Sequence, residues 1–170
     1  MRASTLAFAL FFAVSVPIAC DHSDNFPGVT GPVLVELQTA ESQYDVGETV
    51  IVEITIANAE NVGSVPFHLR FDGNVLSYLP PAEEGPFMSE GGAITTVFLA
   101  SVAGGGGELI VGLSRVGTAR GADGAGVLAR FHFEAVSAGS SGFAFTGAAV
   151  KDPQAMNLPA AFSVRQVTIL

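Results

Sequence analysis

Short runs of alternating apolar and polar residues, separated by turn residues, fill the chain from Val33 to its end. Alternation with a period of two puts successive side chains on opposite faces of a strand. The runs predict strands at 33–40, 49–59, 64–72, 74–79, 94–103, 108–115, 125–136, 142–150 and 160–170. None of the runs is long and helically periodic, so an all-β fold with two packed sheets is expected.

The alternation also assigns faces. The predicted core positions on three strands are Val50, Val52, Ile54 and Ile56, then Val65, Phe67, Leu69 and Phe71, then Phe131 and Phe133. Their polar neighbours Arg130, His132 and Glu134 are expected to face solvent. Burial of each large apolar side chain contributes roughly 1.5–3 kcal/mol. A core of this kind can hold the sandwich together without disulfides, which a chain with one cysteine cannot form internally.

Residues 1–19 have the order of a secretory signal. Arg2 precedes an apolar run over residues 6–14, and Pro17 follows it. This apolar run is shorter than the ~20 residues that a membrane-spanning helix needs. We therefore expect an exported protein.

Cys20 follows Ala19 directly, and residues 16–20 resemble the lipobox of bacterial lipoproteins. Pro17 stands where leucine is usual and Ile18 is larger than the usual small residue. The resemblance implies lipidation of Cys20, with residues 20–32 as a flexible tether and residues 33–170 as the domain. The membrane would then be contacted only through the lipid, at the cell envelope. The alternative is cleavage nearby, which leaves a secreted chain with a free thiol.

The charge balance argues against nucleic-acid binding. Sixteen acidic residues face seven basic ones, giving a formal net charge of −9, and Lys151 is the only lysine. Such a surface repels phosphate backbones.

No catalytic constellation and no cofactor motif is found in the sequence. The adjacent Glu83 and Glu84 lie in a Pro/Gly segment, where they are expected to splay into water rather than form a glycosidase pair. His68 and His132 are expected on exposed strand faces, and whether the fold joins them stays open. The run Gly104–Gly107 is predicted to connect two strands of a hairpin.

No metal site is predicted, because a second cysteine and any helical histidine pair are lacking. His22 and Asp24 lie on the tether, where two weak ligands rarely form a site. Asp72, Asp123 and Asp152 are expected to cap turns. A surface calcium ion at one of these three turns stays open as an alternative.

Five segments, taken in order, resemble the cohesin domain. They are Val-Gly-Glu-Thr-Val at 46–50, VIVEITIANAENV at 50–62, Phe-Asp-Gly-Asn-Val-Leu at 71–76, GVLARFHFEAV at 126–136 and Val-Thr-Ile at 167–169. The chain departs from the family pattern at Gly73, where proline is usual, and at Pro66, which removes a backbone donor from a strand inside a sheet.

The resemblance implies a jelly-roll sandwich of about nine strands, a fold that cohesins share with certain carbohydrate-binding modules. It also implies that the sheet holding the third, fifth and sixth predicted strands receives the partner. The expected partner-binding face comprises His68, Arg70, Thr96, Phe98, Ile110 and Ser114. The alternative is that a loop such as 80–93 covers Phe98 and Ile110.

The leading hypothesis is therefore a non-catalytic, membrane-tethered module that recruits another extracytoplasmic protein, with a dockerin-like partner as one candidate. A carbohydrate-binding module that attaches to polysaccharide is the alternative, weakened because the chain has no tryptophan and only two tyrosines. A structural part of an envelope or secretion assembly is a third class. An enzyme is not expected.

Overall fold

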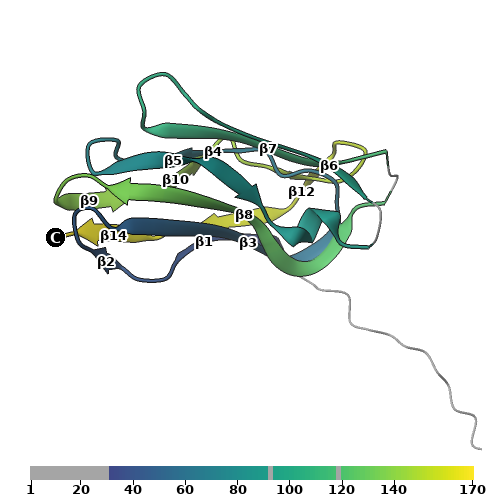
Figure 1. Cartoon of the computed structure of the whole chain (residues 1–170). Helices are drawn as coiled ribbons and strands as arrows, with labels where there is room; N and C mark the ends of the chain where they lie inside the picture. The colour runs from purple at the N-terminus through teal and green to yellow at the C-terminus, as the bar shows by residue number, and fades with distance from the viewer. Residues whose placement is uncertain (1–30, 92–93, 118–119) are drawn as a thin grey trace, which may run out of the picture.

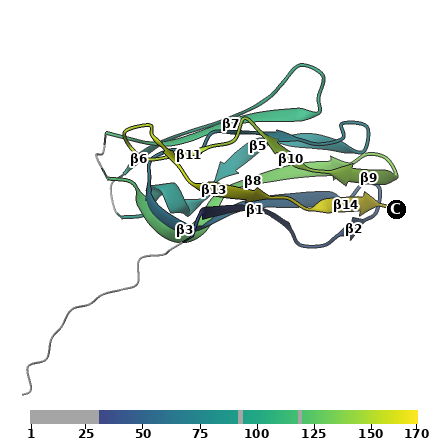
Figure 2. The same cartoon turned by 180° about the vertical axis from the view of Figure 1, so that it is seen from behind.

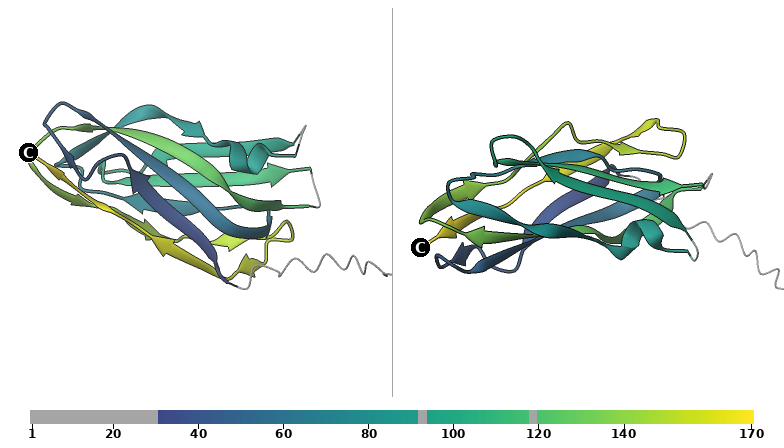
Figure 3. Two further views of the ribbon diagram at one scale, coloured as in Figure 1. Left: turned by 90° about the horizontal axis from the view of Figure 1, so that it is seen from below. Right: turned by 45° about the horizontal axis from the view of Figure 1, so that its top comes forward.

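Two β-sheets lie face to face and enclose an apolar core in the computed structural model (Figures 1 and 2). The structure describes residues 31–91, 94–117 and 120–170. The predicted all-β sandwich is confirmed, and no α-helix occurs in these three ranges. Figure 3 shows the same two layers from below and with the top brought forward.

The larger sheet has five strands, in the order β13 (Ala160–Ser163), β1 (Val33–Thr39), β3 (Thr49–Val62), β8 (Ala122–Ala135) and β5 (Leu76–Glu84). The opposing sheet has four, in the order β10 (Ala144–Thr146), β4 (Phe67–Arg70), β7 (Glu108–Val116) and β6 (Thr95–Val102). Non-sequential neighbours in both sheets are typical of a sandwich in which the chain crosses repeatedly between layers.

Two smaller sheets complete the ends of the sandwich. One consists of β2 (Gln43–Tyr44), β14 (Gln166–Ile169) and β9 (Gly139–Gly142), and it lies at the end that carries the C-terminus (Figure 1). The other is a hairpin of β11 (Val150–Lys151) and β12 (Asn157–Leu158). The sequence predicted one strand at 142–150 and one at 160–170, but each is divided. The divided strands pair in different sheets, which alternation alone cannot reveal.

Aromatic rings join the two sheets. Phe67 on β4 meets Phe131 on β8 edge to face, with ring centroids 6.4 Å apart and planes at 88°. Phe71 meets Phe133 in the same manner at 4.9 Å. Edge-to-face contacts of this kind add about 0.5–1.5 kcal/mol beyond the area that they bury. All ten core positions predicted from the alternation on these strands are buried.

The described part of the segment, residues 80–91, does not form the covering loop that the sequence allowed. β5 runs on to Glu84, where it pairs with β8, and a 3-10 helix η1 (Pro86–Ser89) follows. Phe87 and Met88 on η1 are fully buried in the core. This segment therefore closes one end of the sandwich and leaves the outer face of the four-stranded sheet uncovered, since Ile110 on β7 stays 42% exposed.

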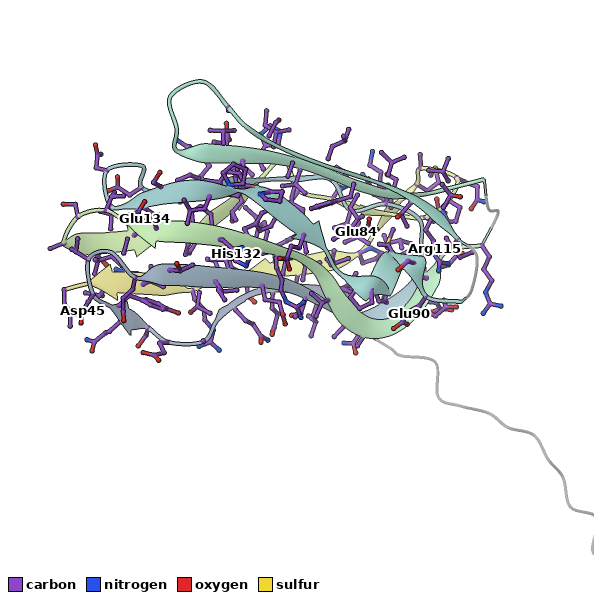
Figure 4. The ribbon with its side chains drawn as sticks, in the orientation of Figure 1. Asp45, Glu84, Glu90, Arg115, His132 and Glu134 are labelled. Carbon is purple, nitrogen blue, oxygen red and sulfur yellow. The ribbon has the colours of Figure 1, made fainter. Side chains whose placement is uncertain are left out.

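Arg115 fixes that same end of the sandwich. Its guanidinium donates to four backbone carbonyls, those of Met88 at 2.7 Å, Gly121 at 2.7 Å, Arg120 at 3.5 Å and Glu90. Figure 4 shows Arg115 and Glu90 together, at the opposite end from Asp45 and Glu134. A planar cation with several donors suits this task, because one side chain can satisfy carbonyls from separate turns.

A second link joins the end of β3 to the start of β8. The Asn61 backbone N–H donates to Asp123 Oδ1 at 2.7 Å, and the Gly121 N–H donates to Asn61 Oδ1 at 2.8 Å. The Asn61 hydrogen bond holds the pKa of Asp123 below its usual value, partial burial opposes this shift, and Arg120 adds to it. As expected from the sequence, Asp72 and Asp152 also accept backbone N–H groups in their turns.

Close packing against the backbone predicts a strong effect of a methyl group at Gly85. A Cβ atom there would lie 2.2 Å from the carbonyl oxygen of Val127. We expect Gly85→Ala to lower the free energy of unfolding by about 1–3 kcal/mol through overpacking. Gly104→Ala is the matched control, since nothing lies within 4 Å of its Cβ position, and it should change stability by less than about 0.5 kcal/mol. Urea denaturation measures both, and equal stabilities would contradict the packing described.

The Asp123 link predicts a pH-dependent loss of stability. The folded-state pKa is lowered, so the contribution is fully present above the unfolded-state pKa of about 3.9 and is lost as the pH falls through the folded-state value. We expect Asp123→Ala to cost about 1 kcal/mol at pH 7 and progressively less below about pH 4. Denaturation curves across this range, with the exposed Glu134→Ala as control, measure the difference. A cost that does not change with pH would contradict the assignment to the carboxylate.

Candidate binding face

The outer face of the four-stranded sheet carries apolar side chains on two strands. Leu99 and Val97 on β6 are 67% and 44% exposed, and Ile110 and Val116 on β7 are 42% and 45% exposed. The antiparallel register sets Leu99 opposite Gly112, Val97 opposite Ser114 and Ser101 opposite Ile110. We call the surface of Val97, Leu99, Ile110, Gly112 and Ser114 the outer apolar face.

Gly112 leaves this face locally shallow. Nothing lies within 4 Å of the position that its Cβ atom would occupy. Leu99 therefore stands beside an open position rather than beside a second large side chain. An exposed leucine beside a residue without a side chain is accessible to a contacting surface from that side.

A charged edge borders the apolar residues along β4. His68 pairs in register with Ile110, and Arg70 pairs with Glu108. His68 Nδ1 lies 3.4 Å from Glu108 Oε1, and the Thr146 hydroxyl donates to the same oxygen at 3.4 Å. The face thus combines an apolar half on β6 and β7 with a polar half on β4 and β10, an anatomy common in protein interfaces.

Four of the six residues predicted for the partner-binding face lie together on this outer surface, namely His68, Arg70, Ile110 and Ser114. Thr96 and Phe98 do not, and their expected outward orientation is wrong. Phe98 is half-buried and packs against the core, and Thr96 shares its side of β6. Whether the outer face binds a partner stays a prediction.

The sequence analysis did not include Leu99 and Val97 because the alternation on β6 does not show which of the two sets of residues faces the core. Both sets of residues on this strand are uncharged, so composition does not separate the buried set from the exposed one. The hairpin itself holds the missing signal. Its turn is centred between Gly105 and Gly106, and residues equidistant from that point pair. Once Leu109 and Val111 are assigned to the core, Ile110 and its partner Ser101 share the outer face with Leu99.

The other candidates for chemistry are not brought together. His132 on β8 alternates with the buried Phe131 and Phe133, so it faces outward from the five-stranded sheet, whereas His68 faces outward from the opposing sheet. Figure 4 shows His132 on the ribbon of that larger sheet. Glu83 and Glu84 are both exposed neighbours on β5. No step of acid–base catalysis is apparent from this arrangement.

Within residues 31–91, 94–117 and 120–170, no group of three or more His, Cys, Asp and Glu side chains is arranged to hold a metal ion. The same part of the chain contains no helix long and apolar enough to cross a membrane. The predicted signal at 1–19, the lipidation site Cys20, and His22 and Asp24 on the tether lie outside the described residues.

The register of β6 predicts opposite outcomes for neighbouring substitutions. Phe98→Asp should lower the free energy of unfolding by about 2–4 kcal/mol, because it puts a carboxylate against the core. Leu99→Asp should change it by no more than about 0.5 kcal/mol, because this side chain already faces water. Thermal or urea denaturation measures both variants. The reverse ranking would mean that the sequence-based orientation of β6 was right after all.

Comparison with known proteins relates this fold to cohesins. No protein-family model matches the chain, and no curated protein matches it. Among solved structures, the non-cellulosomal cohesin from Archaeoglobus fulgidus is 20% identical with a TM-score of 0.67, and the match covers 82% of this chain and 92% of that one. A type II cohesin domain from the cellulosome of Acetivibrio cellulolyticus is 16% identical with a TM-score of 0.69, covering 81% and 95%.

A third match is the sixth cohesin from scaffoldin B of Acetivibrio cellulolyticus, solved in complex with a mutant Cel5 dockerin. It is 17% identical with a TM-score of 0.66, and the match covers 82% of this chain and 100% of that one. At these identities the likeness concerns the fold. The chain is an all-β sandwich with the fold of cohesin domains.

Proposed function

We propose that the chain is a non-catalytic module that binds another extracytoplasmic protein through its outer apolar face. The observation that carries this proposal is the solvent-exposed set of Leu99, Val97 and Ile110 on a sheet that no other described element covers. Exposed apolar patches on a protein surface mark interaction sites. Structural neighbours of this chain include cohesins crystallised with dockerins, which supports a protein ligand of the dockerin kind.

The polar half of the face would help to select and orient the partner. Arg70 is an exposed cation in an otherwise acidic chain, and Glu108 lies beside it in the register of β4 and β7. Charges at the rim of an interface tune the association rate and partner choice more than affinity. A partner with an apolar ridge flanked by an acidic group near Arg70 would fit this arrangement.

Sugar binding is less well supported than protein binding. Carbohydrate-binding surfaces stack sugar rings on exposed aromatic side chains. Tyr44 is buried, and its hydroxyl accepts the Glu41 backbone N–H at 3.0 Å. The Tyr78 ring packs on Phe131 and Phe133, and burial raises the pKa of its hydroxyl group. Tyr44 is thus buried and Tyr78 half-buried, so neither is a fully exposed platform.

The proposal includes an envelope location, supported by the sequence alone. The apolar leader and the position of Cys20 behind Ala19 favour acylation of that cysteine. An anchored module would present its face to secreted or envelope proteins. Labelling with a fatty acid that depends on Cys20 tests this part separately from partner binding.

Partner capture tests the proposed face directly. The full chain is used as bait against the secreted and envelope proteins of its source organism, alongside Leu99→Asp and Ile110→Asp variants. A single saturable partner should be captured, and each substitution should weaken it by about tenfold or more, as at interface hot spots.

Ile51→Asp is the matched control for this capture. Ile51 is 45% exposed on β3, so it resembles Ile110 in size and exposure but lies in the opposing sheet. This variant should bind the partner normally. Loss of binding in all three variants, or retention on insoluble polysaccharide with no captured protein, would contradict the proposal.

A further inference from the structure

β6 is an open edge of the four-stranded sheet. It ends the order β10-β4-β7-β6 and pairs with β7 alone among the described strands. The pairing runs from Thr95 opposite Val116 to Val102 opposite Leu109 without a bulge. The strand is therefore regular along its whole length, and no described strand is hydrogen-bonded to its other side.

The hydrogen bonding of the hairpin shows which backbone groups face that open side. The Ala103 N–H donates to the Glu108 carbonyl at 2.9 Å. In an antiparallel ladder the residues that bond to one neighbour alternate with those that do not. Residues in step with Ala103, such as Leu99 and Ser101, therefore bond to β7. The N–H and C=O groups of Thr96, Phe98, Ala100 and Val102 point outward from the sheet edge.

The other edges of the five-stranded and four-stranded sheets are protected against strand addition, and β6 is not. β5 carries Pro80 and Pro81 and then two glutamates, β10 has three residues, and β13 has four and directly follows Pro159. Prolines, charges and short length are the usual means of blocking a sheet edge. The sequence of β6, TTVFLASV, is eight residues long and contains no charge, no proline and no glycine.

We propose that β6 pairs antiparallel with β6 of a second copy of this chain, which would join two four-stranded sheets into one. A two-fold axis at Leu99 sets Phe98 opposite Ala100 and Thr96 opposite Val102, and each pair exchanges N–H and C=O groups across the axis. In this register the outward-pointing N–H and C=O groups of all four residues find hydrogen-bond partners in both copies. A register shifted by two residues would leave some of them without partners.

The side chains fit the same register. Phe98 meets Ala100 of the second copy, so a large group lies beside a small one on the inner side. On the outer side Leu99 faces Leu99 in a non-hydrogen-bonded pair, the type in which the Cα atoms and the side chains lie closest together. The two outer apolar faces would then be continuous across the axis. An uncharged strand also suits self-association in a chain with a formal net charge of −9, because no like charges meet at the axis.

Site-specific disulfides test the register in the full chain, with Cys20→Ser removing the native thiol. Leu99→Cys puts two thiols opposite each other, with Cα atoms about 4.5 Å apart, within the range that a disulfide spans. Under mild oxidation this variant should form a covalent dimer about tenfold faster than Val97→Cys or Ile110→Cys alone. A mixture of Val97→Cys and Ser101→Cys should form the mixed dimer, because these positions face each other across the axis. Equal rates for all single variants would overturn the proposal.

Sedimentation of the same Cys20→Ser chain under reducing conditions tests association itself. The dimer should be lost in Leu99→Lys, which brings two cations together at the axis, and retained in Ile110→Lys on the neighbouring strand. Screening by added salt should strengthen the dimer of this acidic chain. A monomer at all concentrations, or equal loss in both lysine variants, would overturn the proposal. The proposed partner-binding function does not depend on either outcome.

Discussion

The contact between the two sheets is the constraint on which the rest of this molecule depends. The chain has a single cysteine, so no disulfide within the chain joins the layers, and the packing of buried side chains is their main contact. Phe67 and Leu69 from one sheet meet Phe131 and Phe133 from the other, all of them buried almost completely. Rings that meet edge to face set the distance between the two sheets and also stabilise their packing. The rigidity of this core allows the outer surfaces to carry features that stability alone would not favour.

Polar side chains at one end of the sandwich hydrogen-bond to backbone groups of neighbouring elements. Arg115 donates to the carbonyls of Met88, Gly121 and Glu90, and Asn61 and Asp123 link two strand ends. Leu99 and Ile110 on the four-stranded sheet stay exposed to water. The proposed partner-binding role rests on this exposed apolar surface.

Much of the fold could be predicted from the sequence, because one buried face forces a strict alternation on β3, β4 and β8. The prediction failed where that condition fails. On β6 both faces are uncharged, so the sequence analysis placed Phe98 on the outer face, where the structure has Leu99. The C-terminal segment reads as one continuous strand, yet β13 and β14 pair with β1 and β2 in different sheets. Long-range pairing of this kind depends on contacts between distant segments that no local pattern contains. The hydrogen bonds from Arg115 to backbone carbonyls could not be predicted either, since a single arginine on a strand is ordinary.

The parallel pairing of β1 with β13 and of β14 with β2 has a mechanical consequence. Strands β1 and β14 run in the same direction, from the end where Val33 begins to the end where the C-terminus lies (Figures 1 and 2). Tension applied ahead of Val33 and beyond Ile169 therefore acts along the strands and in opposite directions. It shears the ladder between β1 and β13, so that several hydrogen bonds must break together rather than one after another. A domain connected in this way resists being pulled apart by its two ends.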